Sequence, residues 1–318
     1  MSSTVRRFYF FLTALILLFF TNSLFSTYSR DSATPLRHDH VRWTVLDVSD
    51  ENSQADANLL EFGNGEVVLI DAGETSHHLI PQLQKLKIRR INKVVISHPH
   101  KDHYNGVYSL IASSIIIDEL YLNLPPRNIC DSEIPWGCDF GDLERLIVAS
   151  NRKNILIKKA TTGDTLVKFG NLDLKVLIAH DGVSAPVGAT DINDLSLIMS
   201  LKNDSTRALF TGDLNNKLGS FLALNMAIDL KAQLLKVPHH GTDSLAPNSF
   251  FEAVSPLEAF VPSPDSLWLS DRSKRARDWF NSRGLHPMVT GHVGAVRIEL
   301  FPNSYQIIEL GKSLKNPL

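Results

Sequence analysis

The stretch SHPHKDH, residues 97–103, places three histidines and one aspartate in seven positions of a chain that has only 12 histidines. The short apolar run KVVIS leads directly into this stretch and predicts a buried strand. In an extended turn, His98 and His100 are two residues apart and face the same way, whereas Asp102 and His103 face a neighbouring point. Imidazoles and carboxylates are ligands for zinc or manganese. The alternatives are therefore a polar surface loop or a loop that supplies two metal ions about 3.5–4 Å apart.

Other apolar strands of the chain also end in acidic residues or histidines. Asp71 lies at the end of EVVLIDAG, Asp213 at the end of RALFTGD, and His239 and His240 at the end of LLKVPHHG. Each taken alone has an ordinary explanation as a turn residue, a helix cap or a surface polar group. Taken together with SHPHKDH, they indicate one metal site built from the tips of several strands.

The rest of the chain predicts an α/β protein. Hydrophobic residues make up 43% and charged residues 21%, as in ordinary globular proteins. The net charge of −2 excludes a global basic field that would attract nucleic acid or an anionic membrane. Strands come in pairs, one of them around Gly63-Asn64-Gly65, and helices recur between them. Without a long internal linker or a short repeat, residues 42–318 are expected to form one domain.

The N-terminus has the pattern of an export signal. Arg6 and Arg7 precede residues 8–20, which are apolar except for one threonine. This run is shorter than the roughly 20 residues that span a bilayer, and no clean A-x-A cleavage site follows it. Residues 1–27 are therefore a cleaved signal peptide or a retained membrane anchor, followed by a linker over residues 28–41. Either alternative predicts an exported protein, periplasmic or extracellular, because the arginines stay inside.

Two further patterns concern the surface of the domain. Cys130 and Cys138 lie close together in CDSEIPWGC, and in an exported protein we favour a disulfide over two unrelated thiols. Residues 270–284, SDRSKRARDWFNSRG, combine basic and aromatic residues at helical spacing. A solvated amphipathic helix is favoured there over a helix that contacts a polyanion.

The motifs SHPHKDHYNG, LIDAG, LFTGD and VPHHGT resemble those of the metallo-β-lactamase superfamily. The order LDV, QADANLL, IDAG, HPHKDH, NDLS, TGD and KVPHHG is similar to the ComEC-type competence branch over residues 43–300. The opening departs from that branch, because LDVSDENSQADA stands where LDVGQGDA is usual. The resemblance implies an αββα four-layer sandwich with metals at one edge, in a stand-alone exported relative of the competence proteins.

The resemblance also implies how the SHPHKDH loop divides its ligands. His98 and His100 would hold a first ion, metal 1, and Asp102 and His103 a second ion, metal 2. Asp213 would bridge the two ions. Two divalent ions are thus expected, with zinc favoured over manganese.

The remaining roles follow from the same resemblance. His240 would be a ligand of metal 2, His239 would contact a substrate oxygen, and Asp71 would support the loop. Many members of the superfamily supply another histidine to metal 1, but ATDINDLSL, residues 189–197, has none. Metal 1 is therefore expected to be weaker or to use Asp191 or water.

A function follows from a carboxylate-bridged pair of metal ions. Such a pair lowers the pKa of a shared water, and the sequence predicts a metal-dependent hydrolase that uses a metal-bridging hydroxide. Asp102 or Asp213 would orient this water or accept its proton, and His239 would stabilise the developing charge. The chain has no evident phosphate-binding glycine loop and no evident Ser-His-Asp arrangement.

The substrate class rests on the resemblance alone. The ComEC-type domain is associated with degradation of one DNA strand, and similar extracellular relatives cleave wall polymers. A phosphodiesterase or nuclease acting on single-stranded DNA or a wall polymer is therefore favoured. The alternatives are a hydrolase of a carboxylic ester, thioester or lactam, and a non-catalytic metal-binding module. If the N-terminal segment is uncleaved, a membrane contact through it is expected, and no protein partner is implied.

Overall fold

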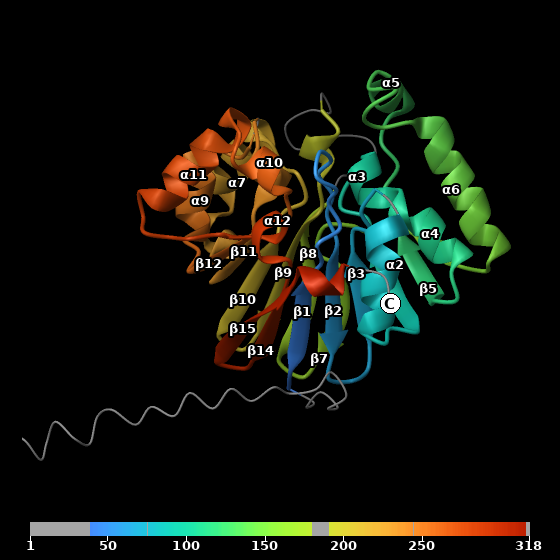
Figure 1. The fold of residues 1–318 in the computed structure, drawn as a ribbon, viewed down its shortest axis with the longest axis horizontal. Coiled ribbons are helices and arrows are strands. Elements are labelled where there is room, and N and C mark those ends of the chain that lie inside the picture. Colours follow the sequence, from blue (N-terminus) through green and yellow to red (C-terminus); the bar gives the residue numbers. More distant parts are fainter. Residues whose placement is uncertain (1–38, 75, 180–190, 244, 316–318) are drawn as a thin grey trace, which may run out of the picture. The chain divides into compact units, whose positions relative to one another are not determined.

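The computed structural model of the protein describes residues 39–74, 76–179, 191–243 and 245–315. Within these residues, the strands form two sheets that pack face to face, and helices cover both outer faces (Figure 1). The predicted α/β fold with αββα layering is confirmed.

The first sheet has eight strands in the order β15-β14-β1-β2-β3-β4-β5-β6. The strands from β3 to β6 run parallel, and the others pair antiparallel. The hairpin predicted around Gly63-Asn64-Gly65 joins β2 to β3. The bounds are β1 (Val41–Val45), β2 (Asn58–Phe62), β3 (Val67–Ile70), β4 (Arg90–Val95), β5 (Ile116–Tyr121), β6 (Leu156–Lys158), β14 (Ala295–Phe301) and β15 (Ser304–Gly311).

The second sheet has seven strands in the order β13-β12-β11-β10-β9-β8-β7. The strands from β10 to β13 run parallel, and those from β7 to β10 pair antiparallel. The bounds are β7 (Thr165–Phe169), β8 (Leu172–Ile178), β9 (Ile198–Asn203), β10 (Thr206–Phe210), β11 (Leu234–Lys236), β12 (Glu258–Val261) and β13 (Met288–Val289).

Helices from the first half of the chain cover the first sheet, and those from the second half cover the second sheet (Figure 1). The first group is α2 (Ser76–Lys85), α3 (Lys101–Tyr104), α4 (Gly106–Ala112), α5 (Arg127–Asp131) and α6 (Phe140–Arg152). The second group is α7 (Asn216–Asn225), α8 (Ala227–Leu230), α9 (Asn248–Val254), α10 (Asp265–Trp268) and α11 (Lys274–Asn281), while α12 (Thr290–Val293) lies between β13 and β14 in the chain and packs Val293 against the core between the sheets. Short 3-10 turns are η1 (Asn193–Leu195), η2 (Pro238–Gly241), η3 (Asp271–Ser273) and η4 (Lys312–Leu314).

Alternation of side chains along each strand fills the layers on its two sides. In β10, Ala208 and Phe210 lie in the core between the sheets, whereas Leu209 packs with the helices outside. Trp43 of β1 crosses the central layer and meets Phe210 and Phe260 edge-on, at ring-centroid distances of 4.8 and 4.9 Å. Truncation of such a buried aromatic side chain typically costs about 3–5 kcal/mol. These contacts join the two sheets into one body.

Three boundaries differ from the sequence-based expectations. β1 begins at Val41, the last residue assigned to the linker, because Val41 already pairs with Leu300 of β14 and Phe62 of β2. The helix expected over residues 270–284 is divided into η3 and the amphipathic α11. Residues 290–293, expected among the closing strands, form α12. A Cβ atom on Gly291 would lie 2.4 Å from a backbone nitrogen of α10, so this turn requires glycine.

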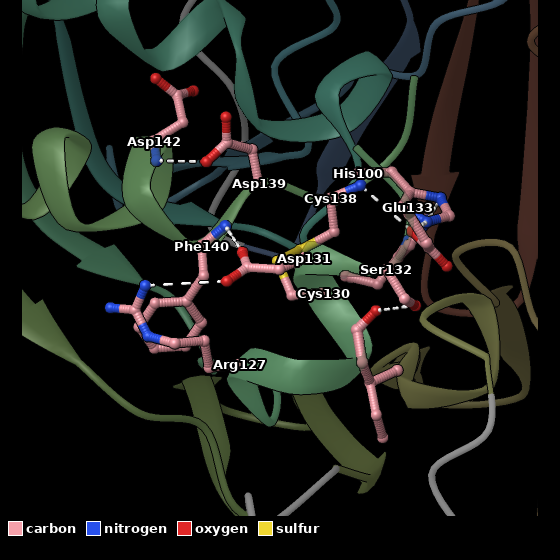
Figure 2. The surroundings of a disulfide bond; sticks show 12 residues. His100, Arg127, Cys130, Asp131, Ser132, Glu133, Cys138, Asp139, Phe140 and Asp142 are labelled. Carbon is pink, nitrogen blue, oxygen red and sulfur yellow. Dashed lines mark hydrogen bonds and ion pairs between the residues drawn. A yellow bond between two sulfur atoms is a disulfide. The ribbon is translucent and has the colours of Figure 1, made fainter. Parts of the chain in front are cut away.

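The predicted disulfide between Cys130 and Cys138 is confirmed (Figure 2). Within the described ranges, every helix is too short or too polar to cross a membrane. The signal peptide or anchor predicted over residues 1–27 lies outside the described residues.

Candidate metal centre

The side chains selected from the sequence meet at the carboxyl ends of four strands. Asp71 follows β3, residues 97–103 follow β4, Asp213 follows β10 and His240 follows β11. β3 and β4 are parallel neighbours in the first sheet, and β10 and β11 are parallel neighbours in the second. Because parallel strands end at the same edge, each sheet delivers two sets of polar groups to one place.

Asp71 anchors the loop after β4. Its Oδ1 accepts a hydrogen bond from the Ser97 backbone N–H at 2.7 Å, and its Oδ2 accepts one from the Ser97 hydroxyl at 2.8 Å. The same Oδ2 lies 2.9 Å from Nδ1 of His103, so the opposite ring nitrogen of His103 faces the centre. The loop also needs a glycine, because a Cβ atom on Gly106 would lie 1.9 Å from the carbonyl oxygen of Ala72.

Four donor residues form a compact cluster, the donor quartet: Asp102, His103, Asp213 and His240. Their donor atoms all lie within 4.8 Å of one another. Nε2 of His240 is 3.1 Å from Asp213 Oδ2 and 3.3 Å from Asp102 Oδ2. Nε2 of His103 is 3.3 Å from the same oxygen of Asp213. His240 is oriented by its Nδ1–H, which donates to the carbonyl oxygen of Pro262 at 2.7 Å.

The donor quartet fits a divalent cation. The Nε2 atoms of His103 and His240 are buried and have no hydrogen-bond partner, although carboxylate oxygens surround them. Buried polar atoms without partners are costly, and a cation bound by two imidazoles and two carboxylates would satisfy all of them. This set of nitrogen and oxygen donors suits zinc or manganese.

The electrostatics of the donor quartet agree with a cation site. Burial by itself lowers the pKa of His240, but Asp213 and Asp102 outweigh it and raise this pKa to about 9. Burial also lowers the pKa of His103, and the surrounding carboxylates raise it well above its usual value. Burial raises the pKa of Asp213, whereas His240, His103 and Lys236 lower it well below its usual value. The carboxylates thus stabilise positive charge on the two imidazoles, and a cation bound at the same place would be stabilised in the same way.

The histidines assigned to metal 1 form a pair. Nε2 of His98 lies 3.2 Å from Nδ1 of His100, so both rings turn a nitrogen toward one point. Among the described residues, no third histidine, cysteine or carboxylate completes a donor group with this pair. Asp191, expected as a substitute ligand, is engaged elsewhere, because Oδ2 accepts from the Asn215 amide at 2.7 Å.

The sequence-based reasoning missed a buried lysine behind the donor quartet. The ammonium of Lys236 donates to the carbonyl oxygen of Gly212 at 2.8 Å and contacts Asp56. Asp56 and Asp71 belong to a second group of buried donors beside the first. The signal in the sequence was a lysine inside the apolar run LLKVP. Lysine is rarely buried unless it is paired, so its place in a buried strand indicated acidic partners.

An open cleft of about 520 Å³ leads to the centre. It is lined by His239, which was expected to meet the substrate, and by Asp102 of the donor quartet. Nδ1 of His239 has no hydrogen-bond partner, and burial is the main cause that lowers the pKa of this ring. Lys101 and Arg272 bring positive charge to the cleft, and Trp136 brings an indole ring that is 73% exposed.

The fold and the site resemble those of metal-dependent hydrolases of the metallo-β-lactamase type. Residues 51–119 match the family model described as Metallo-beta-lactamase superfamily. A solved mutant of CmlA beta-hydroxylase has a similar fold, with a TM-score of 0.50 and 11% identity, over 82% of this chain and 54% of that one.

Two curated relatives indicate a narrower group. ComE operon protein 3 of Bacillus subtilis (strain 168) is 22% identical over 243 residues, which cover 66% of this chain and 28% of the relative. Competence protein ComA of Neisseria gonorrhoeae is 24% identical over 247 residues, covering 76% and 29% respectively. These matches confirm the resemblance to the competence branch of the superfamily. The match spans less than a third of the length of either relative.

Proposed function

We propose that the protein is an exported metal-dependent phosphodiesterase that cleaves a phosphodiester polymer, with single-stranded DNA as the first candidate substrate and a wall polymer as the second. The observation that carries the proposal is the buried donor quartet at an open cleft. Similarity to the Neisseria gonorrhoeae protein named competence protein ComA supports a DNA-related substrate.

The donor residues would hold two cations. Asp102, His103, Asp213 and His240 would bind one, and His98 and His100 would contribute to the other. Zinc is favoured over manganese because imidazole nitrogens make up so much of the donor set. When bound, such cations act as Lewis acids and bring the pKa of a water ligand toward neutrality.

The protein's own side chains would supply binding and proton transfer. The ring of His239 lines the cleft, and burial lowers its pKa, so the ring can contact a phosphoryl oxygen as an uncharged group. Lys101 and Arg272 can pair with phosphate charges along the cleft. The exposed face of Trp136 can stack on a base or a sugar ring. The two cationic side chains line the cleft together with Glu74 and Asp102, so its lining is mixed in charge.

Export is supported by the disulfide. Structural disulfides persist in oxidising compartments and are rare in the cytosol, so the Cys130–Cys138 bond agrees with the signal pattern over residues 1–27.

The test uses the full chain, purified in detergent. Bound metal is measured by plasma mass spectrometry, and hydrolysis is measured with bis-p-nitrophenyl phosphate, single-stranded DNA and nitrocefin. We expect bound divalent metal and phosphodiester hydrolysis that is lost on chelation and regained with zinc or manganese. Absence of metal, or activity that survives Asp213→Ala, overturns the mechanism. Turnover of nitrocefin without phosphodiester turnover overturns the substrate class.

A further inference from the structure

Nε2 of His100, the ring nitrogen that points away from His98, contacts a glutamate that lies outside the metal-ligand motifs described above. Nδ1 of His100 faces His98, while Nε2 lies 2.7 Å from Oε2 of Glu133 (Figure 2). Both side chains of this pair are largely buried, at 11% and 12% exposure. A carboxylate on the far nitrogen of a metal-binding histidine fixes which nitrogen carries the proton and how the ring is turned.

The disulfide loop, residues 130–138, holds Glu133 in place. The backbone N–H of Cys138 donates to the same Oε2 at 3.1 Å, and the bond from Cys130 to Cys138 closes the loop around it. Lys101, the residue after His100, donates from Nζ to the carbonyl oxygen of Pro135 at 2.7 Å. The loop is thus tied to the SHPHKDH segment from two directions.

Gly137 leaves the space that the Glu133 side chain occupies. A Cβ atom on Gly137 would lie 2.5 Å from Oε2 of Glu133 and 2.9 Å from its Cβ. Any side chain at residue 137 would therefore push the carboxylate away from His100. This observation is independent of the hydrogen bonds and gives a second way to move the same group.

We propose that Glu133 is a positioning residue for the metal 1 histidines. Its carboxylate accepts the Nε2–H of His100, so that Nδ1 is left without a proton and faces the same point as Nε2 of His98. The Cys130–Cys138 disulfide acts through Glu133, because it holds this carboxylate against His100. This inference rests on the metal centre of the proposed function and extends it to a pair that lacks a third protein donor.

The first test is a Co²⁺ titration of the full chain, followed by the visible absorption of the bound ion and by calorimetry. The wild type is expected to bind two ions. Glu133→Ala should weaken one of them by about 10- to 100-fold, the usual cost of losing such an outer partner, and leave the other unchanged. Glu133→Gln keeps an oxygen acceptor and should recover most of this affinity. Glu144→Ala, an exposed glutamate on α6, is the control and should change neither ion.

The second test separates the carboxylate from the loop. Reduction of the disulfide, or Gly137→Ala, should weaken the same ion in the wild type by a similar factor. Neither change should weaken it further in Glu133→Ala, because the carboxylate through which both act is already gone.

Three outcomes overturn the inference. The first is unchanged affinity for both ions in Glu133→Ala, and the second is a wild type that binds one ion only. The third is reduction that weakens Glu133→Ala as strongly as the wild type. If the wild type binds ions and cleaves phosphodiesters, and Glu133→Ala behaves identically, the inference about Glu133 fails but the proposed function stands. A wild type that binds no ion overturns the proposed function and this inference together.

Discussion

The ammonium Nζ of Lys236 lies 3.5 Å from Oδ1 of Asp213, and both side chains are 1% exposed. The same ammonium contacts Asp56, whose side chain is fully buried. One oxygen of Asp213 thus faces a permanent internal cation, while Oδ2 faces the histidines of the donor quartet. The lysine offsets the repulsion between buried carboxylates that lie close together before any metal binds.

Lys236→Met tests this internal charge. Methionine has a similar volume, but it leaves the carboxylates of Asp56 and Asp213 without their cation. Breaking a buried ion pair from one side typically costs about 3–5 kcal/mol, so the free energy of unfolding should fall by this amount. Urea denaturation in the presence of a chelator measures it. Lys231→Met, at an exposed lysine near β11, should cost less than about 0.5 kcal/mol. Equal losses in the two variants would contradict the role of Lys236.

His240→Ala tests the donor quartet. The ring bridges toward Asp102 and Asp213, so its removal deletes a direct donor. Loss of a residue that only hydrogen-bonds a metal ligand typically weakens metal binding by about 10- to 100-fold. Loss of His240, a direct donor, should weaken zinc binding by more than this, and the rate of hydrolysis should fall as well. His286→Ala removes an exposed histidine and should change neither quantity. Zinc competition with a chromophoric chelator gives the affinity, and retained zinc binding in His240→Ala would refute the site.

Trp136→Ala tests the indole at the cleft. Loss of one base–aromatic stack costs about 1–3 kcal/mol, so KM for single-stranded DNA should rise at least about fivefold with kcat nearly constant. Metal content should not change. Ile134→Ala, on the same loop and 49% exposed, does not line the cleft and serves as the control. A fall in kcat without a change in KM would place Trp136 outside substrate binding.

Glu299→Gln tests the pH dependence of stability. Burial raises the pKa of Glu299, but contact with the His40 ring and the charge of Arg42 outweigh burial and lower this pKa below 4.5. A carboxylate with a lowered folded-state pKa contributes stability that is present above its unfolded value and is lost as pH falls through the folded value. The variant should therefore lose about 1–3 kcal/mol at pH 7.

The loss in Glu299→Gln should shrink as pH drops below 4.5. Urea denaturation of both proteins between pH 7 and pH 3 measures the difference. Glu309→Gln, at an exposed position of β15, should change stability by less than about 0.5 kcal/mol throughout. A difference that stays constant down to pH 3 would contradict the assignment.

The sequence predicts the parts of the site that lie at strand tips. Asp71, Asp213 and His240 each close an apolar run, and an apolar run of strand length marks both a buried strand and its end. The two-sheet fold is what the resemblance to the metallo-β-lactamase superfamily implies, and the disulfide is favoured because two cysteines lie close together in a chain with an export pattern. These features are local in the sequence, which is why pattern reasoning reaches them.

Side-chain partners across the fold are not predictable in this way. Glu133 is one of many charged residues in its region, and only the closed loop turns it toward His100. Asp191 stands at a plausible place for a ligand, but an Asn215 amide far along the chain engages its carboxylate. Lys236 can be buried because two acidic partners surround it, Asp56 from the segment before β2 and Asp213 from the segment after β10. Each of these outcomes depends on tertiary contacts that no short pattern encodes.

The two sheets contribute equally to the donor quartet. Asp102 and His103 follow a strand of the first sheet, whereas Asp213 and His240 follow strands of the second. Neither half of the chain supplies the whole quartet, so uptake of the proposed cation would be a late event that awaits the docking of both sheets. Scarcity of metal would then reduce the lifetime of the finished fold rather than the rate at which it forms, and the amount of intact protein would follow the metal supply of its compartment.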